Sequence, residues 1–167
     1  MNLDPSVIDR EVTGATTGVP QVLLNYAPAS RGPWRLKALI DPKGHPVTSR
    51  FITVRPSDSS VQLEYLWALL NSPVANAYAF SYLGKRDVLV GTMREMPIPI
   101  ASEHDIGRIS ARVRTYLANV KQLQSRTRGR SEEHQVRQSL LDVDADVLKL
   151  YGLPPKCERQ VLDVFAG

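Results

Sequence analysis

The segment from Gln62 to Leu83 is the most apolar stretch of this chain, and a polar corner divides it into two halves. In each half, apolar side chains recur at three- and four-residue steps, which places them on one face of a helix. Asn71-Ser72-Pro73 separates the halves, because Asn or Ser caps a helix N-terminus and proline fits the first helical turn. Two short helices folded about this corner are therefore the expected core. Their stripes consist of Leu63, Leu66, Trp67 and Leu70, and of Val74, Ala77, Tyr78 and Tyr82.

Short apolar runs bounded by Pro, Gly and Ser predict strands ahead of this core. In the second run, alternation places Arg35 and Lys37 on one face of the strand, opposite Trp34. Asp41 to Gly44 is typical of a turn. Residues 1–20 show no period and are predicted to be an irregular lead-in. The predicted strands span residues 21–26, 34–40 and 49–54.

Two long amphipathic helices are predicted after the core. Pro97-Ile98-Pro99 first predicts an extended segment, because prolines spaced by one residue fit neither a helix nor a central strand. An apolar stripe of about five turns then begins at Ser102 or Asp105. A second helix begins at Ser131, where acidic neighbours favour a helix start, and ends at Gly152. The chain further predicts a hinge at residues 125–130, a last short helix at 157–165 and a short extra strand at 88–90.

These patterns predict an α+β fold. A small, mainly antiparallel sheet packs on a short helix pair and is followed by a long C-terminal helical hairpin. The hydrophobic period changes from two to about 3.6 near Ser60, which marks the transition from strands to helices. We expect residues 1–100 to form the α+β part and residues 101–167 to form the hairpin with the short terminal helix.

Three motifs occur in an informative order. Residues 65–73, YLWALLNSP, are followed by Met96-Pro97-Ile98-Pro99, and the pair resembles the "LxALLNS" and "lPIP" signature of target recognition domains. Val147 to Leu153 also resembles the "VxxLYGL" segment that follows such domains. These domains occur in adenine-specific DNA methyltransferases of restriction-modification and phage-defence systems, and in related specificity subunits. The resemblance spans residues 20–165 and implies recognition of double-stranded DNA.

The motifs of methyl transfer itself are absent from the sequence. An adenine-specific methyltransferase needs a Gly-rich cofactor motif after a strand and an (Asn/Asp)-Pro-Pro-(Tyr/Phe) tetrapeptide. The chain's one Pro-Pro pair, Pro154-Pro155, follows Leu153 and precedes Lys156. We therefore expect no enzymatic activity from the chain alone and no cofactor. We expect a detached or truncated recognition part that acts with a methyltransferase subunit or domain.

Metal chemistry is not indicated either. Asp142, Asp144 and Asp146 form the only carboxylate cluster, and their alternate spacing on a helix sends them to different faces, so we predict a solvated helix face. Cys157 is the only cysteine, which permits no internal disulfide, and we predict a buried structural thiol.

Composition and charge are those of a globular chain that tolerates a polyanionic partner. Hydrophobic residues make up 43% and the formal net charge is +4. No apolar run approaches the roughly 18 residues that span a bilayer, and the start of the chain lacks a secretion signal, so we expect a cytoplasmic protein without membrane contact.

Basic side chains beside an aromatic residue on a sheet suit phosphates and base edges, because the arginine fork matches both. Trp34, flanked by Arg31 and Arg35, is the best single candidate, although it could instead fill the core. Trp67, Phe80 and Tyr82 are predicted to be core residues. The predicted DNA contacts are Arg31, Trp34, Arg35, Lys37, Lys43, Arg50, Lys85 and Arg86.

The helical hairpin leaves an alternative function open. It could be a spacer, a homodimerisation arm or the working surface of a protein-interaction module that never contacts DNA. DNA binding through several phosphates weakens steeply with salt, whereas an apolar helix interface responds little. The arginines of the hinge, Arg126, Arg128 and Arg130, are expected to contribute less to DNA binding than those of the sheet.

Overall fold

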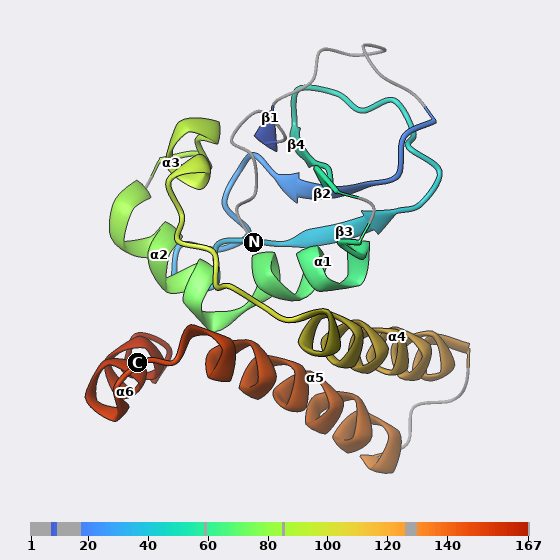
Figure 1. Cartoon of the computed structure of the whole chain (residues 1–167), viewed down its shortest axis with the longest axis vertical. Helices are drawn as coiled ribbons and strands as arrows, with labels where there is room; N and C mark the ends of the chain where they lie inside the picture. The colour runs from blue at the N-terminus through green and yellow to red at the C-terminus, as the bar shows by residue number, and fades with distance from the viewer. Residues whose placement is uncertain (1–7, 10–17, 59, 85, 126–129, 167) are drawn as a thin grey trace.

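The structure is a computed structural model that describes residues 8–9, 18–58, 60–84, 86–125 and 130–166 (Figure 1). A small sheet, a central helix pair and a pair of long helices follow one another along the chain, which confirms the predicted α+β fold. The strands are β1 (Ile8–Asp9), β2 (Gln21–Asn25), β3 (Ala38–Asp41) and β4 (Phe51–Val54). The helices are α1 (Leu63–Asn71), α2 (Pro73–Leu83), α3 (Val90–Arg94), α4 (Glu103–Ser125), α5 (Arg130–Tyr151) and α6 (Pro155–Asp163).

The sheet is antiparallel throughout, with strand order β1-β4-β2-β3. Asn25 pairs with Phe51, and Leu24 pairs with Ala38. The end of β2 and the beginnings of β3 and β4 therefore lie together, and we call this end of the sheet the Asn25 end. Gln21 pairs with Asp41 at the opposite end of the strands, which we call the Asp41 end.

The corner between α1 and α2 forms as the sequence predicts. Ser72 caps α2, since its Oγ accepts a hydrogen bond from the Ala75 N–H at 3.2 Å, and Pro73 occupies the first turn. The same Oγ donates to the Leu69 carbonyl at 2.7 Å, so one buried hydroxyl serves both helices. In Figure 1, α1 lies between the sheet and the two long helices, and its buried side chains contact both.

The two long helices form the predicted hairpin. α4 and α5 run side by side in opposite directions (Figure 1). Ser102 precedes α4 as its cap, accepting from the Asp105 N–H at 3.1 Å, and Gly152 follows α5 with a positive φ of 54°. One hydrophobic cluster contains Val22 of β2, Tyr65 of α1, Ile109 of α4 and Val147 of α5. The division of the chain at residue 100 stays a prediction.

Three local predictions are wrong. Residues 34–37 are not strand, because the N–H groups of Arg35, Leu36 and Lys37 donate to asparagine side chains instead of to a strand partner. The Lys37 carbonyl still accepts from the Asn25 N–H of β2, at 3.2 Å. The run at residues 88–90 forms no strand: Val88 is buried beside the sheet and α3 begins at Val90. Ile8–Asp9 lies inside the expected irregular lead-in but pairs with Val54 and Thr53 of β4, an edge that the sequence does not reveal.

Several burial predictions are also wrong. Cys157, Phe80 and Tyr82 are exposed, because α6 and the outer side of α2 lie at the margin of the fold. Trp67 is buried, as predicted. The DVDAD segment is not a solvated face, since Asp146 is only 1% exposed and forms ion pairs with two arginines of α4.

Candidate nucleic-acid interface

Several loop segments meet at the Asn25 end of the sheet. Tyr26 connects two of them: its N–H donates to the Arg50 carbonyl at 3.0 Å, and its carbonyl accepts from the Val88 N–H at 2.7 Å. The loop of residues 26–37 both leaves and returns at this end, because β2 ends and β3 begins there. Four of the eight predicted DNA contacts lie on these segments with exposed side chains: Arg31, Lys37, Arg50 and Arg86.

Asn25 shapes the loop that carries the first two of these cations. Its Oδ1 accepts from the Lys37 N–H at 2.6 Å, and its Nδ2 donates to the Arg35 carbonyl at 2.9 Å. Asn25 is the last residue of β2, and its side chain supplies two hydrogen bonds that a strand partner would otherwise provide. The loop geometry therefore depends on a residue that sequence reasoning did not select.

Two asparagines of the helix pair fix the other side of this loop. Asn76, fully buried on α2, accepts at Oδ1 from the N–H groups of Arg35 and Leu36, each at 2.8 Å. Asn71 accepts at Oδ1 from the Ala38 N–H at 2.9 Å. A polar amide in the middle of the apolar segment after the corner is the signal that could have identified Asn76, since a buried amide needs hydrogen-bond partners.

Trp34 and Arg35, neighbours in sequence, point to different parts of the molecule. The Trp34 ring lies against Phe165, beyond the last turn of α6, with centroids 4.4 Å apart, and remains partly exposed. The Arg35 guanidinium lies over the ring of Phe80 on α2, with Cζ 5.5 Å from the ring centroid. Arg35 is 2% exposed, whereas Lys37 is exposed, so these two side chains do not share a face as the alternation predicted.

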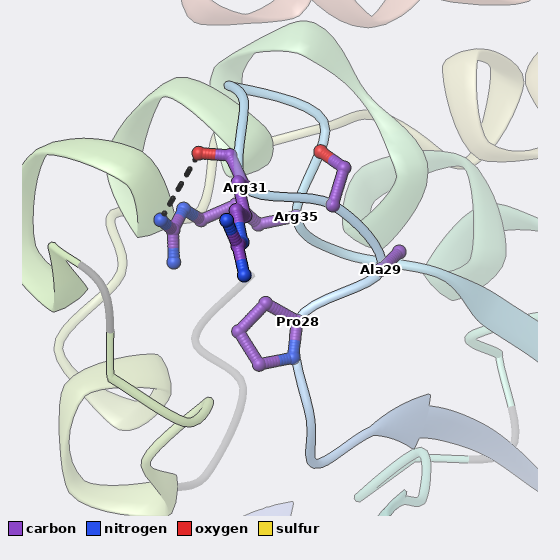
Figure 2. A pocket seen from close by; sticks show the side chains of 5 residues that line it. Pro28, Ala29, Arg31 and Arg35 are labelled. Carbon is purple, nitrogen blue, oxygen red and sulfur yellow. Dashed lines mark hydrogen bonds between the residues drawn. The ribbon is translucent and has the colours of Figure 1, made fainter.

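A pocket of about 680 Å³ opens beside Arg35 (Figure 2). The described residues that line it are Pro28, Ala29, Ser30, Arg31 and Arg35. Figure 2 shows the one hydrogen bond drawn among them, from Nη2 of Arg35 to the Arg31 carbonyl, at 3.5 Å. Nε and Nη1 of Arg35 donate to no partner in the described part of the chain.

Lys43 lies away from this cluster. Lys43 follows Asp41 at the Asp41 end of the sheet. There Asp41 accepts hydrogen bonds from Gln21 at 3.0 Å and from the His45 N–H at 2.6 Å. Burial alone would raise the pKa of Asp41, but the hydrogen bonds from Gln21 and His45 outweigh it and lower the pKa to about 2. We assign this network to closure of the turn. Lys85 lies outside the described residues.

The three arginines of α4 are engaged within the protein. Arg108 and Arg112 pair with Asp146 of α5, and Arg114 pairs with Glu64 of α1 at 3.3 Å. Burial raises the pKa of Asp144, in the same acidic segment, to about 7. These arginines hold helices together, which leaves fewer of their donors for phosphates. Arg126 and Arg128 lie outside the described residues, and only the backbone of Arg130 is described.

Two findings concern metal ions and membrane spans in the residues that the structure covers. No group of three His, Cys, Asp or Glu side chains among them is arranged to hold a metal ion. Within the same ranges, every helix is too short or too polar to cross a bilayer.

Comparisons with known proteins show a shared fold. No protein-family model matches the chain, and no curated protein matches it either. A solved structure, that of the Type IIL restriction-modification enzyme MmeI in complex with DNA, is similar with a TM-score of 0.56 at 14% sequence identity. The match covers 86% of this chain and 20% of the MmeI chain, so the protein spans about one fifth of that enzyme's length. At this identity, the likeness establishes a fold in common with part of a restriction-modification enzyme.

Proposed function

We propose that this protein is a DNA sequence-recognition module of a restriction-modification or phage-defence methyltransferase system. The observation that carries the proposal is the fold match over 86% of the chain to part of an enzyme whose structure was solved with DNA. The resemblance of the YLWALLNSP and MPIP motifs to target recognition domains supports the same function independently of the fold match.

The charges at the Asn25 end support DNA as the ligand. Arg31, Lys37, Arg50 and Arg86 are exposed there, and none of them forms an ion pair with another described residue. Unpaired cations on neighbouring loops can each neutralise a phosphate, since binding to the DNA backbone releases condensed counterions. We therefore place the DNA-facing surface at the Asn25 end. Lys43, at the Asp41 end, lies outside this surface.

We further propose that the chain recognises DNA but does not modify it alone, and that a methyltransferase subunit or domain supplies catalysis. The absence of the cofactor and amine-binding motifs from the sequence supports this division of labour. Incubation of the purified chain with DNA and labelled S-adenosylmethionine should give no labelled DNA. Labelling above background would contradict the proposal.

The test of DNA recognition is a salt series of duplex-binding titrations, followed by fluorescence anisotropy. The variant R31Q/K37Q/R50Q/R86Q removes four exposed charges from the Asn25 end. We expect its salt slope to fall by up to about 0.9 for each phosphate that the variant no longer neutralises. The matched control, K121Q/R137Q/K156Q/R159Q, removes four exposed charges from α4, α5 and α6 and should retain most of the slope. Equal losses in both variants would refute a DNA surface at the Asn25 end.

A protein-interaction module remains the second candidate function, and exposed leucines favour it. Leu117 of α4 and Leu141 of α5 are exposed on the hairpin. An apolar contact through them would form a homodimer or hold a partner helix, with little salt dependence. The double variant L117Q/L141Q should then abolish association in sedimentation experiments, while DNA binding by the wild-type chain would be absent at every salt concentration.

A further inference from the structure

We infer that the pocket beside Arg35 is an oxyanion-binding site that receives a phosphate group, with the Arg35 guanidinium as its principal ligand. Arg35 is 2% exposed, and it lines a pocket of about 680 Å³. Most of its N–H donors are unused, because Nε and Nη1 are buried and have no acceptor among the described residues. The bond from Nη2 to the Arg31 carbonyl, at 3.5 Å, is at the outer limit for a hydrogen bond.

An unpaired guanidinium in this position requires compensation. Buried charges in proteins are paired or hydrogen-bonded, because removing an ion from water is far more costly than removing a neutral group. Here the Phe80 ring supplies only a cation–π contact, and no carboxylate in the described ranges lies within ion-pair distance of Arg35. An anion bound in the pocket would complete the pairing.

The second cation of the pocket narrows the chemistry of that anion. Arg31 lines the pocket with Arg35 (Figure 2), so two like charges lie along one cavity. A group with several charged oxygens can accept from both guanidinium groups at once, and the planar arginine fork matches the geometry of a phosphate. Two asparagine side chains hold the backbone of Arg35 in place. Asn76 accepts from its N–H, and Asn25 donates to its carbonyl.

The pocket belongs to the Asn25 end, and Arg31 is also one of the exposed cations there. The phosphate is therefore assigned to a DNA strand, and in this respect the inference rests on the proposed function. The exposed cations would attract the duplex, whereas Arg35 would hold one phosphate in a fixed place and so set the register of the protein on DNA.

The first arm of the test uses inorganic phosphate and the wild-type chain, so it needs no variant to fold. Protein labelled with ¹⁵N-arginine is titrated with phosphate or with chloride at constant ionic strength, and the Nε–H resonances are followed. The Arg35 resonance is identified by its absence from the R35K spectrum. We expect it to shift saturably with phosphate only, while that of exposed Arg137 does not. Equal responses to the two salts would overturn the oxyanion site.

The second arm uses a DNA duplex and separates this inference from the proposed function. R35Q should weaken binding at least about tenfold, as expected for loss of a charge-assisted hydrogen bond, and K37Q, an exposed change of the same charge, should weaken it less. If phosphate shifts Arg35 but DNA does not bind, the anion site stands and the proposed function fails. If DNA binds R35Q and wild type equally and phosphate shifts nothing, the function stands and the inference fails. If phosphate shifts Arg35 but R35Q binds DNA like wild type, the assignment to a DNA strand is overturned.

Discussion

The ion pairs between α4 and α5 give an asymmetric prediction for the stability of the hairpin. Arg108 and Arg112 both contact Asp146, the latter through Nε at 3.0 Å. The Asp146 side chain is 1% exposed, whereas those of Arg108 and Arg112 are 32% and 44% exposed. Removal of the acid and removal of the bases therefore leave very different residues behind. We compare D146A with R108A/R112A.

The difference in burial sets the magnitudes. D146A leaves two partly exposed arginines that water can solvate again, so we expect a loss of about 1–2 kcal/mol in the free energy of unfolding. R108A/R112A leaves a buried carboxylate without a cation, and we expect a loss of about 3–5 kcal/mol. The triple variant R108A/R112A/D146A should be more stable than R108A/R112A, because it removes the uncompensated charge.

The assay is urea-induced unfolding followed by far-ultraviolet circular dichroism. K121A/R137A is the control, since both residues are exposed on the same two helices, and it should change stability by less than about 0.5 kcal/mol. The reasoning is refuted if D146A costs as much as R108A/R112A, or if the triple variant is no more stable than the double variant.

Three further predictions concern titration and backbone strain. Burial raises the pKa of Asp144 to about 7, so its ionisation opposes folding; stability should fall as pH rises from about 4 to about 7, and D144N should remove this slope in a series of unfolding curves. The pH dependence expected from Asp41 has the opposite sign. Its pKa of about 2 means that the ionised carboxylate stabilises the fold at neutral pH, and this stability is lost as pH falls from about 4 through about 2. D41N should therefore cost about 2 kcal/mol in the free energy of unfolding at neutral pH and little in strong acid. G44A should lower the thermal midpoint more than G152A, because both glycines have positive φ but a Cβ at Gly44 would lie 2.3 Å from the Val19 backbone, whereas the space at Gly152 is open. A larger loss in G152A, or a D144N curve as steep as that of wild type, would contradict these assignments.

Much of the fold could be predicted from the sequence because its signals are local. The helix pair depends on apolar periodicity and on Ser72-Pro73, and both act within a few residues of the corner. The long helices depend on stripes of the same kind. Residues 34–37 show where such signals fail, since alternation is typical of a strand but Asn25 and Asn76 bind the backbone there.

The candidate site could be predicted only in part. The sequence identifies basic residues in the loops around the sheet. The strand register brings Arg31, Lys37 and Arg50 to one end, and the hydrogen bond from the Val88 N–H to the Tyr26 carbonyl brings the segment of Arg86 there. It does not indicate that Arg35 is buried against Phe80, which lies far away in the sequence. Nor does it indicate that Asp146 is paired across the hairpin, because spacing along one helix does not specify what the neighbouring helix presents.

The sequence by itself determined the class of the fold, the corner between α1 and α2 and the two long helices, because periodicity, capping and proline act through neighbouring residues. The tertiary structure alone decided which charged groups are buried, which are paired and which are free. Charge state and burial depend on contacts between distant segments, as between Arg35 and Phe80 or between Asp146 and the arginines of α4. Arginine therefore forms ion pairs between helices in α4 but leaves hydrogen-bond donors without a partner in the described residues beside the pocket.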